Sequence, residues 1–83
     1  MTDQPLELGP QPLDDLMIER AWSNHDLVAA STEHLTHKMV GKGRRGRRLT
    51  RNAQRKLLNA VNALVSEDDD RLVLDDLFNY RGR

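Results

Sequence analysis

One segment of the chain, residues 50–64, carries the clearest pattern for regular structure. Its apolar side chains follow one another at intervals of four, three, one and three residues, as on one face of an α-helix. They are Ala53, Leu57, Ala60, Val61 and Leu64. Thr50 can cap this helix, because a threonine hydroxyl accepts a hydrogen bond from an unpaired amide of the first turn. Since such a helix must bury its apolar face, a helical domain is expected around it.

Shorter helical patterns come before this segment. Residues 13–22 repeat apolar side chains at helical spacing, which predicts a first helix. Ser23, followed three residues later by Asp26, resembles the capping pair of a second helix. Thr36 is suited to cap a third, which is expected to reach Val40.

Glycine, proline and charge mark the segments that are expected to lie outside these helices. Residues 1–12 hold Pro and Gly without periodicity, which predicts a disordered or loosely ordered N-terminal arm. Residues 41–50 combine three glycines with a run of basic side chains, so an exposed cationic loop is expected there. Residues 66–70 are acidic and predict a linker, and the apolar spacing after them predicts a C-terminal helix over 71–81. The folded domain is expected to span residues 13–83.

Size and composition limit the class of fold. A chain of 83 residues without cysteine forms one small domain that packing alone must hold together. The apolar runs are too short to cross a membrane, and the acidic start does not resemble a secretory signal, so a cytoplasmic protein is expected. The sequence therefore predicts an all-α bundle of four or five helices.

The charges are strongly segregated along the chain. The formal net charge is zero, yet residues 34–66 contain no acid and hold nine of the thirteen positive side chains. Residues 1–33 sum to minus six, and residues 67–83 sum to minus three. A cationic block of this density attracts polyanions, because each phosphate that it neutralises releases condensed counterions. With one Trp, one Tyr and one Phe there are few platforms for stacking unpaired bases, which favours double-stranded DNA as the partner.

Two short helices followed by basic residues are typical of a helix-turn-helix. Residues 24–46, NHDLVAASTEHLTHKMVGKGRRG, resemble this unit in the lambda-repressor-like family of Cro and C1 type. Residues 48–64, RLTRNAQRKLLNAVNAL, resemble the helix that follows it. His34 stands where that family usually has a glycine in the left-handed conformation. Leu35 is expected to plug the turn, and Val40 is expected to face inward.

The resemblance implies that the third helix is a recognition helix, whose first residues enter the major groove. A threonine there contacts a thymine methyl group or a phosphate, while histidine and lysine donate hydrogen bonds to guanine. The basic residues that follow are expected to contact phosphates. The expected DNA-binding residues are Thr36, His37, Lys38, Lys42, Arg44, Arg45, Arg47, Arg48, Arg51 and Arg55.

Other functions have less support in the sequence. No nucleophile, histidine and acid stand at a recognisable spacing, so no enzyme, small-molecule substrate or cofactor is expected. His34 and His37 lack further metal ligands at suitable spacing, so no metal is expected either.

The sequence thus predicts a sequence-specific duplex DNA-binding protein that regulates transcription. The alternative is a protein-interaction module, antitoxin-like or an adaptor, whose basic loop grips an acidic partner. The apolar residues Leu77, Phe78 and Tyr80 fit two roles equally well, as a cover for the core or as the contact of a homodimer formed through the C-terminal segment.

Overall fold

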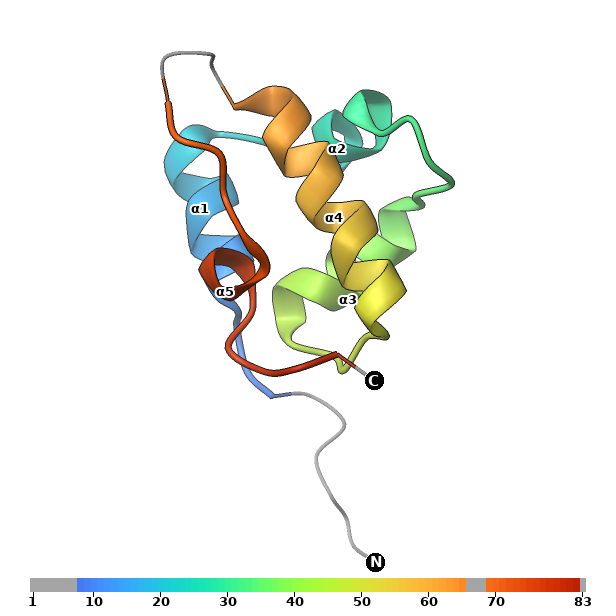
Figure 1. Ribbon diagram of the computed structural model, residues 1–83, viewed down its shortest axis with the longest axis vertical. Coiled ribbons are helices and arrows are strands. Elements are labelled where there is room, and N and C mark those ends of the chain that lie inside the picture. The colour runs from blue at the N-terminus through green and yellow to red at the C-terminus, as the bar shows by residue number, and fades with distance from the viewer. Residues whose placement is uncertain (1–7, 66–68, 83) are drawn as a thin grey trace, which may run out of the picture.

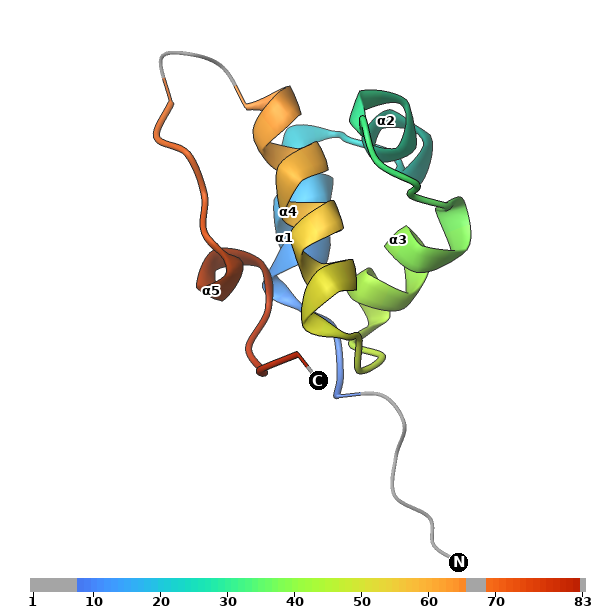
Figure 2. The ribbon, with the colours of Figure 1, turned by 45° about the vertical axis from the view of Figure 1, so that its right-hand side comes forward.

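The computed structural model describes residues 8–65 and 69–82, and within these it contains helices and no strand. The helices are α1 (Pro12–Arg20), α2 (Asn24–Ala30), α3 (His37–Arg45), α4 (Arg51–Leu64) and α5 (Leu74–Leu77). Helix α4 packs against α2, α3 and α5, while α1 packs against α3 and α5 (Figures 1 and 2). The expected all-helical fold is confirmed.

The core forms around the apolar face of α4. Leu57 and Val61 are fully inaccessible to solvent, and Ala53 and Ala60 are buried beside them. Leu64, at the end of the stripe, is only half-buried. The other helices contribute the buried side chains of Leu13, Met17, Leu27, Val40 and Leu77, and the segments outside the helices contribute those of Leu35, Leu49 and Phe78. The spacing in the sequence therefore identified the side of α4 on which the domain is built.

Polar side chains fix where three of the helices begin. The Ser23 hydroxyl accepts a hydrogen bond from the Asp26 amide at 3.2 Å, and the Asp26 carboxylate accepts one from the Ser23 amide at 2.7 Å. The bond from the Ser23 amide holds the pKa of Asp26 below its ordinary value. Thr36 and Thr50 cap α3 and α4 in the expected way, since each hydroxyl accepts from an amide three residues later.

Helix α1 ends earlier than its apolar spacing predicts. It stops at Arg20 because Ala21 takes a left-handed conformation, with a φ of 59°. The Ala21 and Trp22 amides then donate to the carbonyl oxygens of Ile18 and Met17, at 3.2 and 2.8 Å. These bonds complete the last turn, so the chain is free to turn toward the cap of α2.

The expected cationic loop over residues 41–50 is in large part helical. Helix α3 continues through Gly41 and Gly43 to Arg45, and ends where Gly46 adopts a φ of 89°. Gly43 is buried against α4: a Cβ there would lie 2.7 Å from the Leu57 Cδ1 atom. This glycine thus serves close helix packing, which the sequence alone does not distinguish from a loop glycine. The connection to α4 is short, and within it Leu49 is buried.

The C-terminal helix is also shorter than expected, since α5 covers only Leu74–Leu77 of the range 71–81. The backbone of Leu72 bonds instead to the Asn62 side chain of α4, through its amide at 2.8 Å and its carbonyl at 3.0 Å. After α5 the chain is extended at Phe78, whose ring is buried in the core. Leu77 and Phe78 therefore cover the core of the same molecule.

The end of the expected N-terminal arm is part of the fold. Residues 1–7 lie outside the described residues, but Gln11 is completely buried. Its side-chain nitrogen donates to the Gly9 carbonyl at 3.0 Å, and its side-chain oxygen accepts from the Asn79 amide at 2.8 Å. Gln11 thus joins the two ends of the described chain. Of the expected linker, residues 66–68 also lie outside the described part.

Substitution of Gly46 by alanine should destabilise the protein strongly. A Cβ at this position would lie 1.9 Å from the Gly9 carbonyl oxygen, and the backbone φ of 89° already disfavours alanine. We expect Gly46→Ala to lower the free energy of unfolding by more than about 2 kcal/mol, measured by urea denaturation.

Gly9→Ala is the matched control for this experiment. Gly9 has nearly the same φ, 88°, but apart from its two chain neighbours no atom of residues 8–65 and 69–82 lies within 4 Å of its Cβ position. It should cost only the conformational strain, about 1–2 kcal/mol. Equal losses in Gly46→Ala and Gly9→Ala would contradict the close contact between these two segments.

Candidate nucleic-acid interface

The N-terminal end of α3 is exposed, while the opposite face of the helix is buried in the fold. Thr36, His37 and Lys38 are all exposed. The Thr36 hydroxyl accepts a hydrogen bond from the Met39 amide at 3.1 Å, which fixes the first turn. Val40 and Gly43 lie on the opposite side and are buried. The structure thus brings together the three residues that were expected to contact bases.

Helix α2 adds a residue to this end that the sequence analysis did not single out. The ring of His25, in the first turn of α2, stacks on the ring of His37 with 5.6 Å between centroids and 14° between planes. Both side chains are exposed. The two residues are twelve positions apart on different helices, so only the packing of α2 against α3 brings them together.

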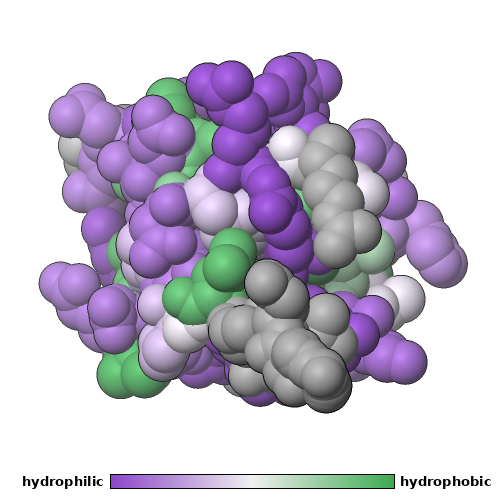
Figure 3. All heavy atoms as spheres, turned by 90° about the horizontal axis from the view of Figure 1, so that it is seen from below, coloured by the Kyte–Doolittle hydropathy of each residue, from purple (hydrophilic) through white to green (hydrophobic). Residues whose placement is uncertain are grey.

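The basic residues after the start of α3 have different surroundings. Lys42 is half-buried, while Arg45, Arg47 and Arg48 are exposed. The Arg47 amide closes the end of α3 by donating to the Lys42 carbonyl at 3.0 Å. Hydrophilic side chains cover much of the lower end of the molecule, where α3 connects to α4 (Figures 1 and 3).

Arg44, one of the expected phosphate contacts, is bonded to two other helices of the fold. Its Nε atom pairs with the Asp14 carboxylate of α1 at 2.5 Å, and its Nη1 atom donates to the Asn24 side chain of α2 at 2.8 Å. The Arg44 and Asp14 side chains retain only 23% and 26% of their exposure. Arg44 therefore holds three helices together, and its charge is neutralised within the fold.

Arg51 and Arg55 are exposed on the first two turns of α4. They lie beside the C-terminal segment, where both line a pocket. The connection before them is held by Tyr80, whose hydroxyl accepts from the Leu49 amide and donates to the Arg47 carbonyl, both at 3.1 Å. The C-terminal segment thus supports the basic connection between α3 and α4.

The turn between α2 and α3 contains His34 and Leu35, whose conformation and role were expected from the sequence. Residues 31–36 separate the two helices. His34 is not left-handed, since Ala21 is the only described residue other than glycine with a positive φ. Leu35 is buried, as expected for the plug of the turn. His34 therefore does not incur the conformational cost that the resemblance implies.

The acidic flanks bond within the fold at several points. Asp69 pairs with Arg20 of α1 at 3.2 Å, and the Asp76 carboxylate accepts from the Val73 amide at 2.8 Å. The guanidinium of Arg20 also lies over the Trp22 ring, 5.7 Å from its centroid. Asp69 therefore bonds to α1, and Asp76 caps the start of α5. The first turn of α3 contains no acidic residue.

Comparison with protein-family models, curated proteins and solved structures found no match. Within the described residues, no helix is both long and apolar enough to span a membrane. The same part of the chain contains no cluster of three or more acidic, histidine or cysteine side chains arranged to hold a metal ion.

The pair of Arg44 and Asp14 should contribute to stability. In a double-mutant cycle of Arg44→Ala and Asp14→Ala, we expect a coupling of about 1 kcal/mol, because both side chains are partly shielded from water. Urea denaturation of the two single variants and the double variant measures it.

Arg47→Ala is the control for this cycle, because Arg47 is exposed and its hydrogen bonds to the described residues are made by its backbone. It should change the free energy of unfolding by less than about 0.5 kcal/mol. Additive losses for Arg44→Ala and Asp14→Ala would contradict the bridging role of Arg44.

Proposed function

We propose that the protein binds duplex DNA through the exposed start of α3 and regulates transcription. The observation that carries the proposal is the position of Thr36, His37 and Lys38 at the exposed N-terminus of a helix whose opposite face is buried. A helix end of this kind fits the major groove, and its unpaired amides favour a nearby phosphate.

The side chains at this end match the chemistry of base edges. Lys38 and His37 can donate hydrogen bonds to the N7 and O6 acceptors of guanine, and the Thr36 methyl group suits the methyl of thymine. The stacked ring of His25 limits the orientations open to His37. In the proposed complex, His25 therefore positions His37 toward one base pair.

Affinity in the proposed complex comes from the basic side chains around this end. Arg47 and Arg48 are exposed in the connection, and Arg51 and Arg55 are exposed on α4. Lys42 and Arg45 carry further positive charge in the last turn of α3. Arg44 is left out of this set, because its guanidinium is bonded to Asp14 and Asn24.

In the proposed function, α2 and α3 act as a helix-turn-helix related to the lambda-repressor-like class. In support, α2 packs against α3, Leu35 is buried in the turn, and α4 follows as the class requires. The conformation at His34 differs from that class. The exposed start of α3 therefore supports the proposed DNA binding more strongly than the geometry of the turn does.

Homodimerisation is part of the proposal, because two copies of a small reading domain bind two half-sites about one helical turn apart. A dimer contact through the C-terminal segment does not involve Leu77 or Phe78, which are buried. Val73, 58% exposed, remains available on that segment. A palindrome among sites selected from random duplexes would support the dimer.

DNA binding should depend strongly on salt. We expect the logarithm of the association constant to fall against the logarithm of salt concentration with a slope of about −5, as roughly five or six phosphate contacts produce. Fluorescence anisotropy with a labelled duplex measures the slope, and a value near zero would contradict the electrostatic part of the proposal.

An acidic polypeptide and a duplex RNA serve as competitors in the same experiment. Displacement by the acidic polypeptide as effectively as by DNA would favour the protein-interaction alternative. Equal competition by duplex RNA would favour RNA as the partner.

His37→Ala should change the relative preference for binding sites. If His37 contacts one base pair, the variant loses about tenfold discrimination at that position only, as for one specific base contact. Affinity for single-base variants of the best selected site measures this effect. His25→Ala should reduce discrimination at the same base pair.

Arg47→Ala is the matched control, because a lost phosphate contact weakens all sequences to the same degree. An unchanged preference profile in His37→Ala would show that α3 does not read the bases.

A further inference from the structure

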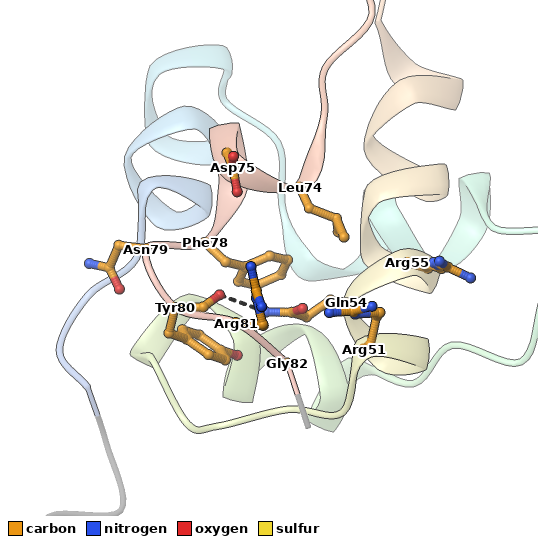
Figure 4. A pocket seen from close by; sticks show the side chains of 10 residues that line it. All are labelled: Arg51, Gln54, Arg55, Leu74, Asp75, Phe78, Asn79, Tyr80, Arg81 and Gly82. Atoms are coloured by element: carbon orange, nitrogen blue, oxygen red, sulfur yellow. Dashed lines mark hydrogen bonds between the residues drawn. The ribbon is translucent and has the colours of Figure 1, made fainter.

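A pocket opens between the start of α4 and the C-terminal segment, and no residue of α3 lines it (Figure 4). Its volume is about 600 Å³, within the range of pockets that hold small molecules. Gly82 fixes how close its two walls lie, since a Cβ there would come within 2.7 Å of the Arg51 Cα atom.

Three guanidinium groups give this pocket a positive lining. Arg51 and Arg55 come from consecutive turns of α4, and Arg81 comes from the opposite wall. Asp75 is the single acid among the residues that line it. Arginine is the side chain best suited to carboxylate and phosphate, because its planar fork can donate two parallel hydrogen bonds. The charge therefore favours an anionic ligand.

Gln54 is a buried polar side chain in the wall of the pocket. This residue is only 2% exposed and lines the pocket. Its nitrogen donates to the Tyr80 carbonyl at 3.4 Å, drawn as the dashed line in Figure 4. Its Oε1 atom lies against Gly82, since a Cβ at that glycine would come within 2.5 Å of it. Gln54 thus helps to pack α4 against the C-terminal segment at the edge of the pocket.

Apolar side chains complete the pocket. Phe78, with its ring against Tyr80 at 5.7 Å between centroids, and Leu74 lie along the wall that faces α4. Such surfaces suit a flat or compact hydrocarbon body, while a hydrated inorganic ion makes no use of them.

We propose that this pocket binds a small organic anion, with a carboxylate or phosphate ester held by Arg51, Arg55 and Arg81 and an aromatic body against Phe78 and Leu74. Carboxylate and phosphate share the chemistry that the guanidinium groups recognise.

A consequence for regulation rests on the proposed DNA-binding function. Arg51 and Arg55 line the pocket and are also proposed phosphate contacts. A ligand that neutralises them competes with DNA for the same charges. The anion would then act as an effector that lowers DNA affinity, without a separate sensing domain.

The first test measures binding of anions to the full chain in the absence of DNA. The probes are 2-hydroxybenzoate, 2-hydroxyphenyl phosphate and inorganic phosphate, with calorimetry for affinity and the Gln54 side-chain amide as the NMR reporter. We expect one of the aromatic anions to bind at least about tenfold more tightly than inorganic phosphate, and to shift the Gln54 resonance. The tighter of the two identifies the preferred anionic group.

Arg81→Gln should weaken that binding about tenfold, the loss expected for one charge-assisted hydrogen bond. Arg81 is outside the proposed DNA-binding set. Arg71→Gln is the matched control, because Arg71 is an exposed arginine that does not line the pocket, and it should leave binding unchanged. Urea denaturation checks that both variants are folded.

Several outcomes would overturn the proposal: no binding of either aromatic anion, equal binding of inorganic phosphate, or equal effects of Arg81→Gln and Arg71→Gln. The regulatory consequence is tested separately, by adding the tighter anion to a duplex complex. Binding of the anion without release of DNA would refute the competition and leave the pocket assignment in place. A failure to bind DNA at all would refute the proposed function and not the pocket.

Discussion

The close contact of α3 with α4 at Gly43 and Leu57 determines the arrangement of the rest of the molecule. Because Gly43 has no side chain, the two helix backbones approach closely, and Leu57 fills the space between them. With the inner face of α3 fixed in this way, His37 and Lys38 are left exposed. The same contact explains how a segment rich in glycine and arginine remains helical, since packing outweighs the low helix propensity of glycine.

The basic and acidic segments of the sequence are only partly separated from each other in the folded protein. Most of the basic side chains lie on exposed positions of α3, α4 and their connection. Lys42 and Lys56 are half-buried, and Asp14 and Asn24 bind the guanidinium of Arg44 between three helices. A sum of charges over a segment therefore overstates the positive charge that a partner meets.

The sequence predicted the features that depend on neighbouring residues. The caps at Ser23, Thr36 and Thr50 and the stripe of α4 follow from spacing within a few positions, so they were found. The helical character of residues 41–45 and the non-helical backbone at Leu72 depend on contacts with residues of α4, which lie well away in the sequence. The stacking of His25 on His37 and the pocket beside Arg81 also join residues that are far apart in the sequence. No local sequence pattern predicts them.

The hydroxyl of Tyr80 ties the C-terminal segment to the connection between α3 and α4. It is bonded on both sides to the backbone between Arg47 and Leu49, and Gly82 then packs against the first residue of α4. A fusion partner or purification tag attached behind this segment would emerge next to the arginines of the connection. Preparations that carry an extension at that end are thus expected to differ in nucleic-acid affinity from those that carry it at the other.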